Sequence, residues 1–300
     1  MTFGAYFEHK TVLIPHDEKR HRGGEDAAHA SASLLVVADG VGGWADHGVD
    51  PGIYSRHLVS GIFDQHDLDP TTTPKDLIKK QNPVTASLHQ GSCTVTVLKI
   101  EGPNQIRTAN IGDSGYALYH VTDDGSLELY FRSKEQQREF NFPYQVGSEG
   151  DDPSVAEEQV HSDVRENDVV MVYSDGYGDN IFTKDFLKCF EATFDKKTKR
   201  FSNMSKAANC QARRAYRFGK KEKYASPFQV GALKVGMRFM GGKHDDIAVI
   251  VAQFHGDSVP KAEQNKKEFF LEDKYTYVDA DGPVEEVAWA KRVQERNEDF

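Results

Sequence analysis

Acidic residues followed by glycine recur at the ends of apolar segments in this 300-residue chain. The pattern occurs in VVADGVGGW (36–44), VVMVYSDGYGDN (169–180) and GGKHDDIAVIV (241–251), and related motifs are GGEDA (23–27) and IGDSG (111–115). A glycine beside a carboxylate permits a sharp turn and a close approach of the backbone to a bound ion. Carboxylates gathered at neighbouring strand ends would repel one another unless cations neutralised them. Such an all-oxygen set suits Mg²⁺ or Mn²⁺, whereas softer metals would require cysteine or clustered histidine.

Other interpretations of these motifs are possible. A single Asp-Gly pair is far more often a hairpin turn than a metal ligand. Five such motifs, most of them after strongly apolar segments, favour one shared acidic site over five unrelated turns. The spacing excludes an EF-hand, whose ligands fall within one loop of about twelve residues. GDSG (112–115) also resembles the nucleophile segment of trypsin-like proteases, but Tyr116 follows it instead of glycine, and Ser114 is interpreted as a turn hydroxyl.

Short β-rich segments precede these carboxylates and are expected to position them. Strands are expected at 34–40, 92–100, 106–121 (two strands that meet at Gly-Asp-Ser-Gly), 126–132, 168–176 and 246–254. Helical spacing predicts helices at 50–66, 182–194 and 202–221, followed by a Gly-rich loop at 221–244. Many short strands with helices in blocks favour an α+β fold with antiparallel sheets.

Charge and composition exclude several classes of partner. The net charge of −10 and the lack of a dense basic stretch argue against nucleic-acid binding.

No apolar run is long enough to span a membrane, and MTFGAYFEHK shows no targeting signal. Three cysteines lie far apart without a CxxC pair, which indicates reduced core residues. We therefore expect a soluble intracellular protein, in the cytoplasm, and a monomer; the mitochondrial matrix is the alternative compartment that the family resemblance given below implies.

The order of ED, ADGVGGW, GDS, SDGxxDN and GGKxDDI resembles the metal-dependent protein phosphatase family, also called PP2C or PPM. The segments ADGVGGWADHGVDPGIYS (38–55) and SKEQQREFNFPYQ (133–145) are similar to its Ptc7-like branch in particular. The resemblance implies two packed antiparallel β-sheets flanked by helices, an αββα sandwich. We expect residues 1–255 to form this PP2C-like domain. Residues 256–300, with twelve acidic and seven basic residues, are expected to form an acidic extension that is partly docked or flexible.

The resemblance also implies a set of metal ligands. Asp39 would bridge two Mn²⁺ or Mg²⁺ ions, and the carbonyl of Gly40 would bind one of them. Glu25 would serve the second ion, and Asp175 and Asp245 would complete the site of the first.

Further acidic residues match outlying positions of the same motif. Asp26 would orient water beside Glu25, and Asp113 and Asp179 match positions linked to a weaker third ion. Asp246, the neighbour of Asp245, is an alternative ligand to it.

The activity implied by the resemblance is hydrolysis of phosphoserine and phosphothreonine in a phosphoprotein substrate. Two divalent ions can acidify a bridging water and neutralise charge on the phosphoryl oxygens. The catalytic set would be Asp39, Glu25, Asp175 and Asp245. A pseudophosphatase that binds partners without catalysis is the alternative, and a metal-dependent nuclease is disfavoured by charge.

Two positions depart from the usual family pattern. Val41 replaces the histidine that often follows Asp-Gly, so a metal-bound water or another histidine must protonate the leaving oxygen. His21 occupies the position of the usual phosphate-binding arginine, between Arg20 and Arg22. On an extended strand His21 would share a face with Glu25, and which of the three cations meets phosphate is left open.

Overall fold

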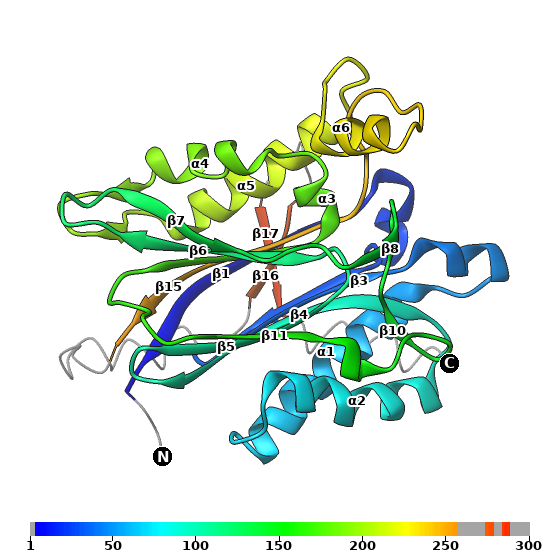
Figure 1. Ribbon diagram of the computed structural model, residues 1–300, viewed down its shortest axis with the longest axis horizontal. Coiled ribbons are helices and arrows are strands. Elements are labelled where there is room, and N and C mark those ends of the chain that lie inside the picture. The colour runs from blue at the N-terminus through cyan, green and yellow to red at the C-terminus, as the bar shows by residue number, and fades with distance from the viewer. Residues whose placement is uncertain (1–3, 257–273, 279–283, 289–300) are drawn as a thin grey trace.

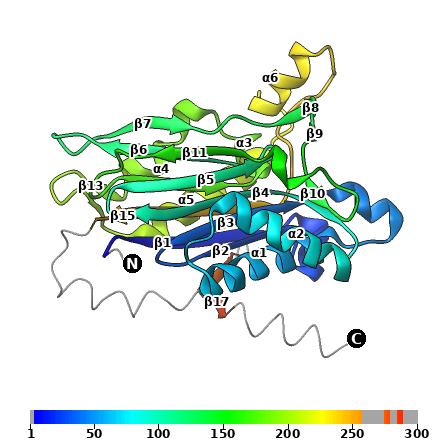
Figure 2. The same cartoon turned by 60° about the horizontal axis from the view of Figure 1, so that its bottom comes forward.

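The computed structural model describes residues 4–256, 274–278 and 284–288. Two β-sheets pack face to face, and helices cover the outer face of each sheet (Figures 1 and 2). The predicted α+β sandwich is therefore confirmed.

The larger sheet has seven strands. Its order is β17 (Val284–Ala288), β16 (Lys274–Val278), β1 (Tyr6–Ile14), β15 (Ile247–His255), β12 (Val169–Tyr173), β6 (Gly115–Val121) and β7 (Leu127–Arg132). All neighbours are antiparallel except β1 and β16, which run parallel.

The second sheet is antiparallel throughout. Its order is β11 (Glu157–His161), β5 (Gln105–Ile111), β4 (Ser92–Gly102), β3 (Leu34–Gly40) and β2 (Asp26–Ala30), and β10 (Val146–Gly147) also pairs with β4. Two small hairpins join β8 (Gln137–Glu139) to β9 (Phe142–Pro143) and β13 (Phe194–Asp195) to β14 (Arg200–Phe201).

The helices form the outer layers. On the second sheet lie α1 (Pro51–Leu68) and α2 (Pro74–Leu88), and on the larger sheet lie α4 (Lys188–Glu191) and α5 (Met204–Gly219). Two further helices are α3 (Asp175–Gly178), which follows β12, and α6 (Pro227–Lys234). The short 3₁₀ helices are η1 (Asp17–Arg22), η2 (Gly42–His47), η3 (Pro153–Val155) and η4 (Thr183–Asp185).

Strands β12 and β15 are buried on both faces, which explains their continuous apolar sequences. In β15, Val249 and Val251 face α5, whereas Ala248 and Ile250 face the opposing sheet. Successive side chains of a strand point to opposite faces, so one strand contributes to both core layers. These rigid central strands end at the acidic motifs.

Several elements differ from the predictions. Strands β1, β2 and β11 and helices α2 and α6 were not predicted, and α6 lies inside the predicted loop 221–244. In α2, Pro83 interrupts the helical pattern, but Thr73 caps the helix and Leu77 and Ile78 bury one face against the second sheet. The predicted helix 182–194 is divided into η4 and α4.

The prediction of three reduced cysteines was wrong. Cys189 of α4 and Cys210 of α5 form a disulfide with a Cα–Cα distance of 5.7 Å, while Cys93 is free and buried. Two cysteines separated by 21 residues without a motif give no local signal of pairing. The cysteine argument for a reducing compartment therefore no longer holds.

Part of the predicted acidic extension adds β16 and β17 beside β1, and the expected domain boundary falls at the end of β15. The rest of 257–300 lies outside the described residues, and the division at 255 stays a prediction. Within the described ranges, no helix is both long and apolar enough to cross a membrane.

The disulfide gives a stability prediction. Reducing it should lower the free energy of unfolding by about 3 kcal/mol, because the unfolded chain regains the entropy of a closed loop. Urea unfolding with and without a reductant measures the change. Cys210→Ser should remove the effect of the reductant, whereas Cys93→Ser should retain it. A reductant effect that persists in Cys210→Ser would contradict the assignment of this pair.

Candidate metal centre

The acidic motifs from both sheets meet at one edge of the sandwich. Asp26 and Asp39 are register partners across β2 and β3, and Glu25 directly precedes β2. Asp175 follows β12, and Asp245 lies two residues before β15, which is paired with β12. The shared strand ends therefore gather residues that are up to about 220 positions apart in sequence.

Backbone contacts hold the acidic residues in place. The carbonyl oxygen of Glu25 accepts hydrogen bonds from the Ser55 hydroxyl at 2.5 Å and the Gly40 amide at 3.2 Å. A side chain at Gly40 would place its Cβ 2.8 Å from that carbonyl, so only glycine fits this approach. The Ser174 hydroxyl donates to Asp26 Oδ2 at 2.7 Å, which links the two sheets directly.

Burial and crowding oppose ionisation of the carboxyl groups. Burial, with repulsion from neighbouring carboxylates, raises the pKa of Asp26, Asp39 and Asp113 well above the usual range. The same causes raise the pKa of Asp245, and they raise that of Asp179 to about 7 against the attraction of Lys243.

Asp175 behaves in the opposite way. Although burial disfavours its charge, Lys243 and a hydrogen bond with Asp39 lower the pKa of Asp175. The carboxyl groups of Asp39 and Asp175 therefore lie near each other, and each shifts the pKa of the other. Such a contact is typical of carboxyl groups that are forced together.

Lys19 neutralises one side of the cluster. Its Nζ lies 2.5 Å from Glu25 Oε2, 2.9 Å from Asp246 Oδ2 and 3.8 Å from Asp245 Oδ1. These carboxylates raise the pKa of Lys19 in spite of its burial.

Lys243 neutralises the other side. Its Nζ contacts Asp175, and it lies 2.8 Å from Asp179 Oδ2 and 3.3 Å from Asp245 Oδ2. Asp245 therefore lies between the two lysines. Neither Lys19 nor Lys243 was identified from the sequence, although Lys243 stands two residues before Asp245 in the GGK motif.

The acidic residues form only part of a divalent-cation site as they lie. As the described residues lie, no three His, Cys, Asp or Glu side chains converge on one coordination point, because ammonium groups stand between the carboxylates. Asp26 Oδ1 and Asp175 Oδ1 are nevertheless buried without a hydrogen-bond partner. Buried oxygens without donors are costly, and hard cations satisfy them. Three cationic side chains contact the cluster: Lys19, Lys243 and Arg22. The acidic residues outnumber them and are Glu25, Asp26, Asp39, Asp113, Asp175, Asp179, Asp245 and Asp246.

The residues predicted to meet phosphate lie on η1 and not on an extended strand, so the argument that placed His21 beside Glu25 was wrong. His21 Nδ1 instead contacts the carbonyl of Glu18 at 3.0 Å. Arg20 contacts Asp17 at 2.9 Å. Arg22 reaches the cluster, with its NH2 group 2.5 Å from Glu25 Oε1. Among the described residues, Arg22 is therefore the one of these three side chains that contacts a carboxylate of the cluster.

The turn between β5 and β6, which carries Asp113, also lies at this edge of the sandwich. Gln137 Nε2 donates to Asp113 Oδ2 at 3.3 Å. Ser114 is fully buried, and its hydroxyl lies 2.7 Å from that of Thr94. This position agrees with a structural role for Ser114 and not with that of a nucleophile.

The chain is similar in sequence to known protein phosphatases. A scan of protein-family models finds none that matches. "Probable protein phosphatase 2C 80" of Arabidopsis thaliana is 34% identical over 255 residues, which cover 81% of this chain and 57% of that protein. "Protein phosphatase PTC7 homolog" of Xenopus laevis is 31% identical over 245 residues, which cover 75% of this chain and 78% of that protein. The matched region spans about half the length of the first two plant relatives, 57% and 50%.

Solved structures show the same fold. The photosystem II phosphatase PBCP is similar with a TM-score of 0.72 and 28% identity, over 82% of this chain and 98% of that one. The catalytic domain of the serine/threonine phosphatase PstP, described in complex with two manganese ions, has a TM-score of 0.58. It is 17% identical, over 84% of this chain and 99% of that one, so this likeness shows the fold alone.

The position of Lys243 generates a prediction about metal binding. Lys243→Met should lower the free energy of unfolding in EDTA by about 2 kcal/mol, because three carboxylates lose a counterion. Added Mn²⁺ should then raise the melting temperature more than in the unaltered protein, because the competing ammonium group is gone. Thermal unfolding with and without Mn²⁺ measures both effects.

Lys234→Met, at an exposed position on α6, is the matched control. It should change neither the free energy of unfolding in EDTA nor the rise in melting temperature with Mn²⁺. A Lys243→Met protein with a smaller response to Mn²⁺ would show that the lysine supports metal binding and does not compete with it.

Proposed function

The chain belongs to the protein phosphatase 2C family, and we propose that it is a metal-dependent protein serine/threonine phosphatase. The observation that carries the proposal is the gathering of Glu25, Asp39, Asp175 and Asp245 at one edge, where carboxyl groups outnumber the lysine and arginine side chains that contact them. Such an edge requires further cations, and a phosphate ester is a substrate that divalent cations bind and activate.

We assign the ligands as follows. Asp39 would serve two Mn²⁺ or Mg²⁺ ions, with Gly40 contributing its carbonyl. Glu25 would complete one site, and Asp175 and Asp245 would complete the other. When bound, the ions would supply Lewis acidity and acidify water at the site.

Outlying residues support this set. Asp26 is fixed by Ser174 through one oxygen, and its free Oδ1 is available to orient water. Asp113 and Asp179 are assigned to a weaker third ion. Asp245 is preferred to Asp246 because its side chain is 24% exposed, whereas that of Asp246 is 2% exposed and accepts hydrogen bonds from the His16 amide and Lys19.

The chain's own cations orient the substrate. Arg22 is the proposed phosphate anchor because it alone of the three predicted cations reaches the cluster. An arginine can bind two phosphoryl oxygens at once. Val41 carries no transferable proton, so a water or another histidine protonates the leaving oxygen.

Two other functions are less well supported. A pseudophosphatase would be expected to lack one of the ligand carboxylates, and all of the predicted ones are present at the edge. A nuclease would have to bind a polyanion with a protein of net charge −10.

The proposed function predicts Mn²⁺- or Mg²⁺-dependent hydrolysis of a phosphothreonine peptide, abolished by EDTA. Asp39→Asn should lower kcat/KM by about a hundredfold or more, because the shared ligand loses its charge. Phosphate release against metal concentration measures this. Asp46→Asn, at an exposed position of η2, makes the same chemical change and should leave activity intact. Activity that survives EDTA would contradict the metal mechanism, and inactivity with every divalent ion would favour the pseudophosphatase.

The phosphate anchor can be tested by comparing two arginines of one turn. Arg22→Gln should raise KM about tenfold, because a charge-assisted hydrogen bond to phosphate is lost. Arg20→Gln should change KM less than twofold, because Arg20 pairs with Asp17 outside the cluster. Steady-state kinetics on the phosphothreonine peptide give both values. Equal changes in KM from the two substitutions would contradict the assignment of Arg22 as the phosphate anchor.

A further inference from the structure

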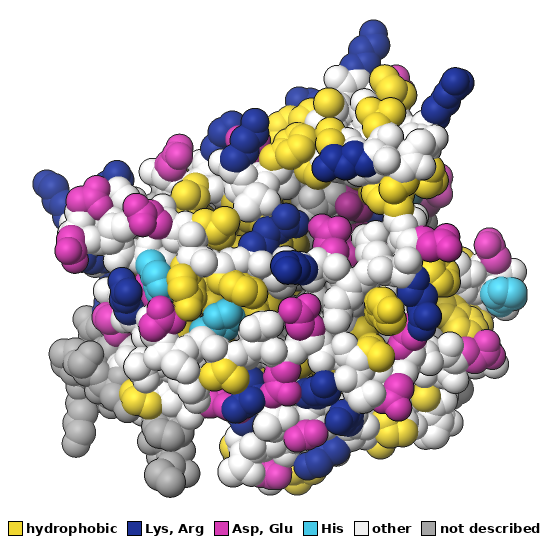
Figure 3. Space-filling view, in the orientation of Figure 1, with side chains coloured by type: hydrophobic (Ala, Val, Ile, Leu, Met, Phe, Trp, Pro, Cys, Tyr) yellow, Lys and Arg dark blue, Asp and Glu magenta, His cyan; other side chains and the backbone are white. Residues whose placement is uncertain are grey.

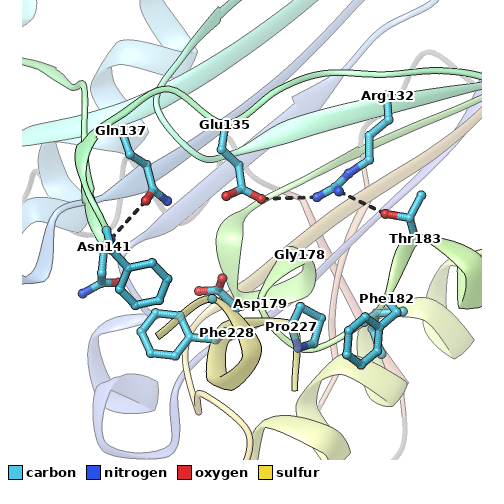
Figure 4. A pocket seen from close by; sticks show the side chains of 13 residues that line it. Arg132, Glu135, Gln137, Asn141, Gly178, Asp179, Phe182, Thr183, Pro227 and Phe228 are labelled. Carbon is cyan, nitrogen blue, oxygen red and sulfur yellow. Dashed lines mark hydrogen bonds and ion pairs between the residues drawn. The ribbon is translucent and has the colours of Figure 1, made fainter. Parts of the chain in front are cut away.

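A pocket of about 170 Å³ lies beside the carboxylate cluster, where three distant segments meet (Figure 4). Its lining comes from 132–141 around β8, from 178–183 after α3, and from 227–231 at the start of α6. Sites for whole small molecules usually have volumes of roughly 300 Å³ or more. The pocket is therefore suited to one long side chain and not to a cofactor.

The walls combine aromatic rings with acidic and amide groups. Figure 4 shows Glu135 and Gln137 along one side and the rings of Phe228 and Phe182 along the other. The rings of Phe140 and Phe228 pack with their centroids 4.9 Å apart. Aromatic faces opposite carboxylates attract a flat cation, which can stack on the rings and donate to the oxygens.

The lining has two carboxyl groups, Glu135 and Asp179, and one guanidinium group, Arg132. Lys243 neutralises Asp179 from the cluster side, at 2.8 Å, and lies 5.1 Å from the Phe228 ring, so Glu135 is the carboxylate on which the charge of the pocket mouth depends. Arg132 is already committed, because it donates to the Tyr173 hydroxyl at 2.9 Å, to Thr183 Oγ1 at 3.0 Å and to Glu135 Oε1 at 3.3 Å. Glu135 is 46% exposed, so its carboxylate is accessible from the pocket mouth.

The pocket shares two contacts with the cluster. Asp179 lines the pocket and also lies 2.8 Å from Lys243 Nζ, which contacts Asp175. Gln137 lines it as well and donates to Asp113 at 3.3 Å. An extended peptide advances by about 3.3 Å per residue, so a chain with its phosphate at the cluster can place a nearby side chain in the pocket.

The surface beyond the pocket could accommodate the rest of such a chain. Figure 3 shows apolar side chains gathered over α6 and the loop after it, and the exposed ones include Leu233, Val235, Met237 and Met240. Exposed apolar surface of this kind marks a site of interaction with another chain.

We propose that this pocket binds an arginine side chain of the phosphoprotein substrate, a few residues from the phosphorylated residue. The proposal rests on the proposed phosphatase function of the neighbouring cluster. It adds a substrate class: phosphoproteins with a basic residue near the phosphorylated site. The net charge of −10 also favours the approach of a basic segment.

The test uses phosphoserine peptides in which a single arginine or a single glutamine occupies each flanking position in turn. At one position, arginine should give about a tenfold higher kcat/KM than glutamine, the effect of one charge-assisted contact. Glu135→Gln should reduce this ratio to below about twofold. The substitution retains an oxygen for Arg132, which also keeps its bonds to Tyr173 and Thr183.

Glu139→Gln is the matched control, because Glu139 is an exposed carboxylate four residues further along the chain that does not line the pocket. Assays at physiological ionic strength limit long-range charge effects to about 8 Å, and the control should keep the full ratio. Phe228→Leu is a second variant, which removes the ring and should also lower the ratio.

Hydrolysis of p-nitrophenyl phosphate with Mn²⁺ separates the two proposals, because this substrate has no flanking side chain. If the unaltered protein fails to hydrolyse it, the phosphatase function and the pocket assignment are both overturned. If hydrolysis occurs but no position prefers arginine, or the preference survives Glu135→Gln, the pocket assignment alone is overturned. A further peptide with leucine at the preferred position that is hydrolysed faster than the arginine peptide would overturn it as well.

Discussion

The repulsion among carboxylates at one edge of the β sandwich is the constraint on which the rest of the structure depends. Glu25 and Asp39 come from one sheet and Asp175 and Asp245 from the other, so packing the sheets brings negative charges together. Buried charges are stable only when counterions accompany them. Lys19 and Lys243 provide two counterions from the chain itself, and divalent cations would provide the others. If the proposed ions bind, folding and metal binding are coupled at this edge.

The same edge connects the chemical site to the surface that would select its substrate. Lys243 contacts Asp175 within the cluster and Asp179 on the pocket wall. The amide of Phe228 in α6 donates to the carbonyl of Asp179, so α6 is fixed to the residue that separates cluster from pocket. Under the two proposals, residues on the α6 side would select the substrate, and the central strands would hold the proposed catalytic carboxylates. Function on this fold depends on such sites and not on the fold alone.

The sequence was most informative where the signal is local. Apolar runs that end in Asp-Gly correctly predicted β3 and β12 and placed Asp39 and Asp175 at their ends. It was least informative where partners lie far apart, as for the Lys19–Asp246 ion pair and the Cys189–Cys210 disulfide. The short η1 turn was also missed, because its charged residues show no periodicity, and its helical form reversed the roles expected of His21 and Arg22. Tertiary contacts decide such segments, and local propensity does not.

The most direct test of the cation requirement is anomalous X-ray diffraction from crystals grown with Mn²⁺, which locates each ion independently of activity. The account predicts two strong manganese peaks at the edge, with Asp39 a ligand of both, Asp175 and Asp245 on one, and Glu25 on the other. It also predicts that the ammonium groups of Lys19 and Lys243 move away from the oxygens that bind metal. Ordered side chains without manganese, and with both lysines still paired to the carboxylates at saturating Mn²⁺, would contradict it.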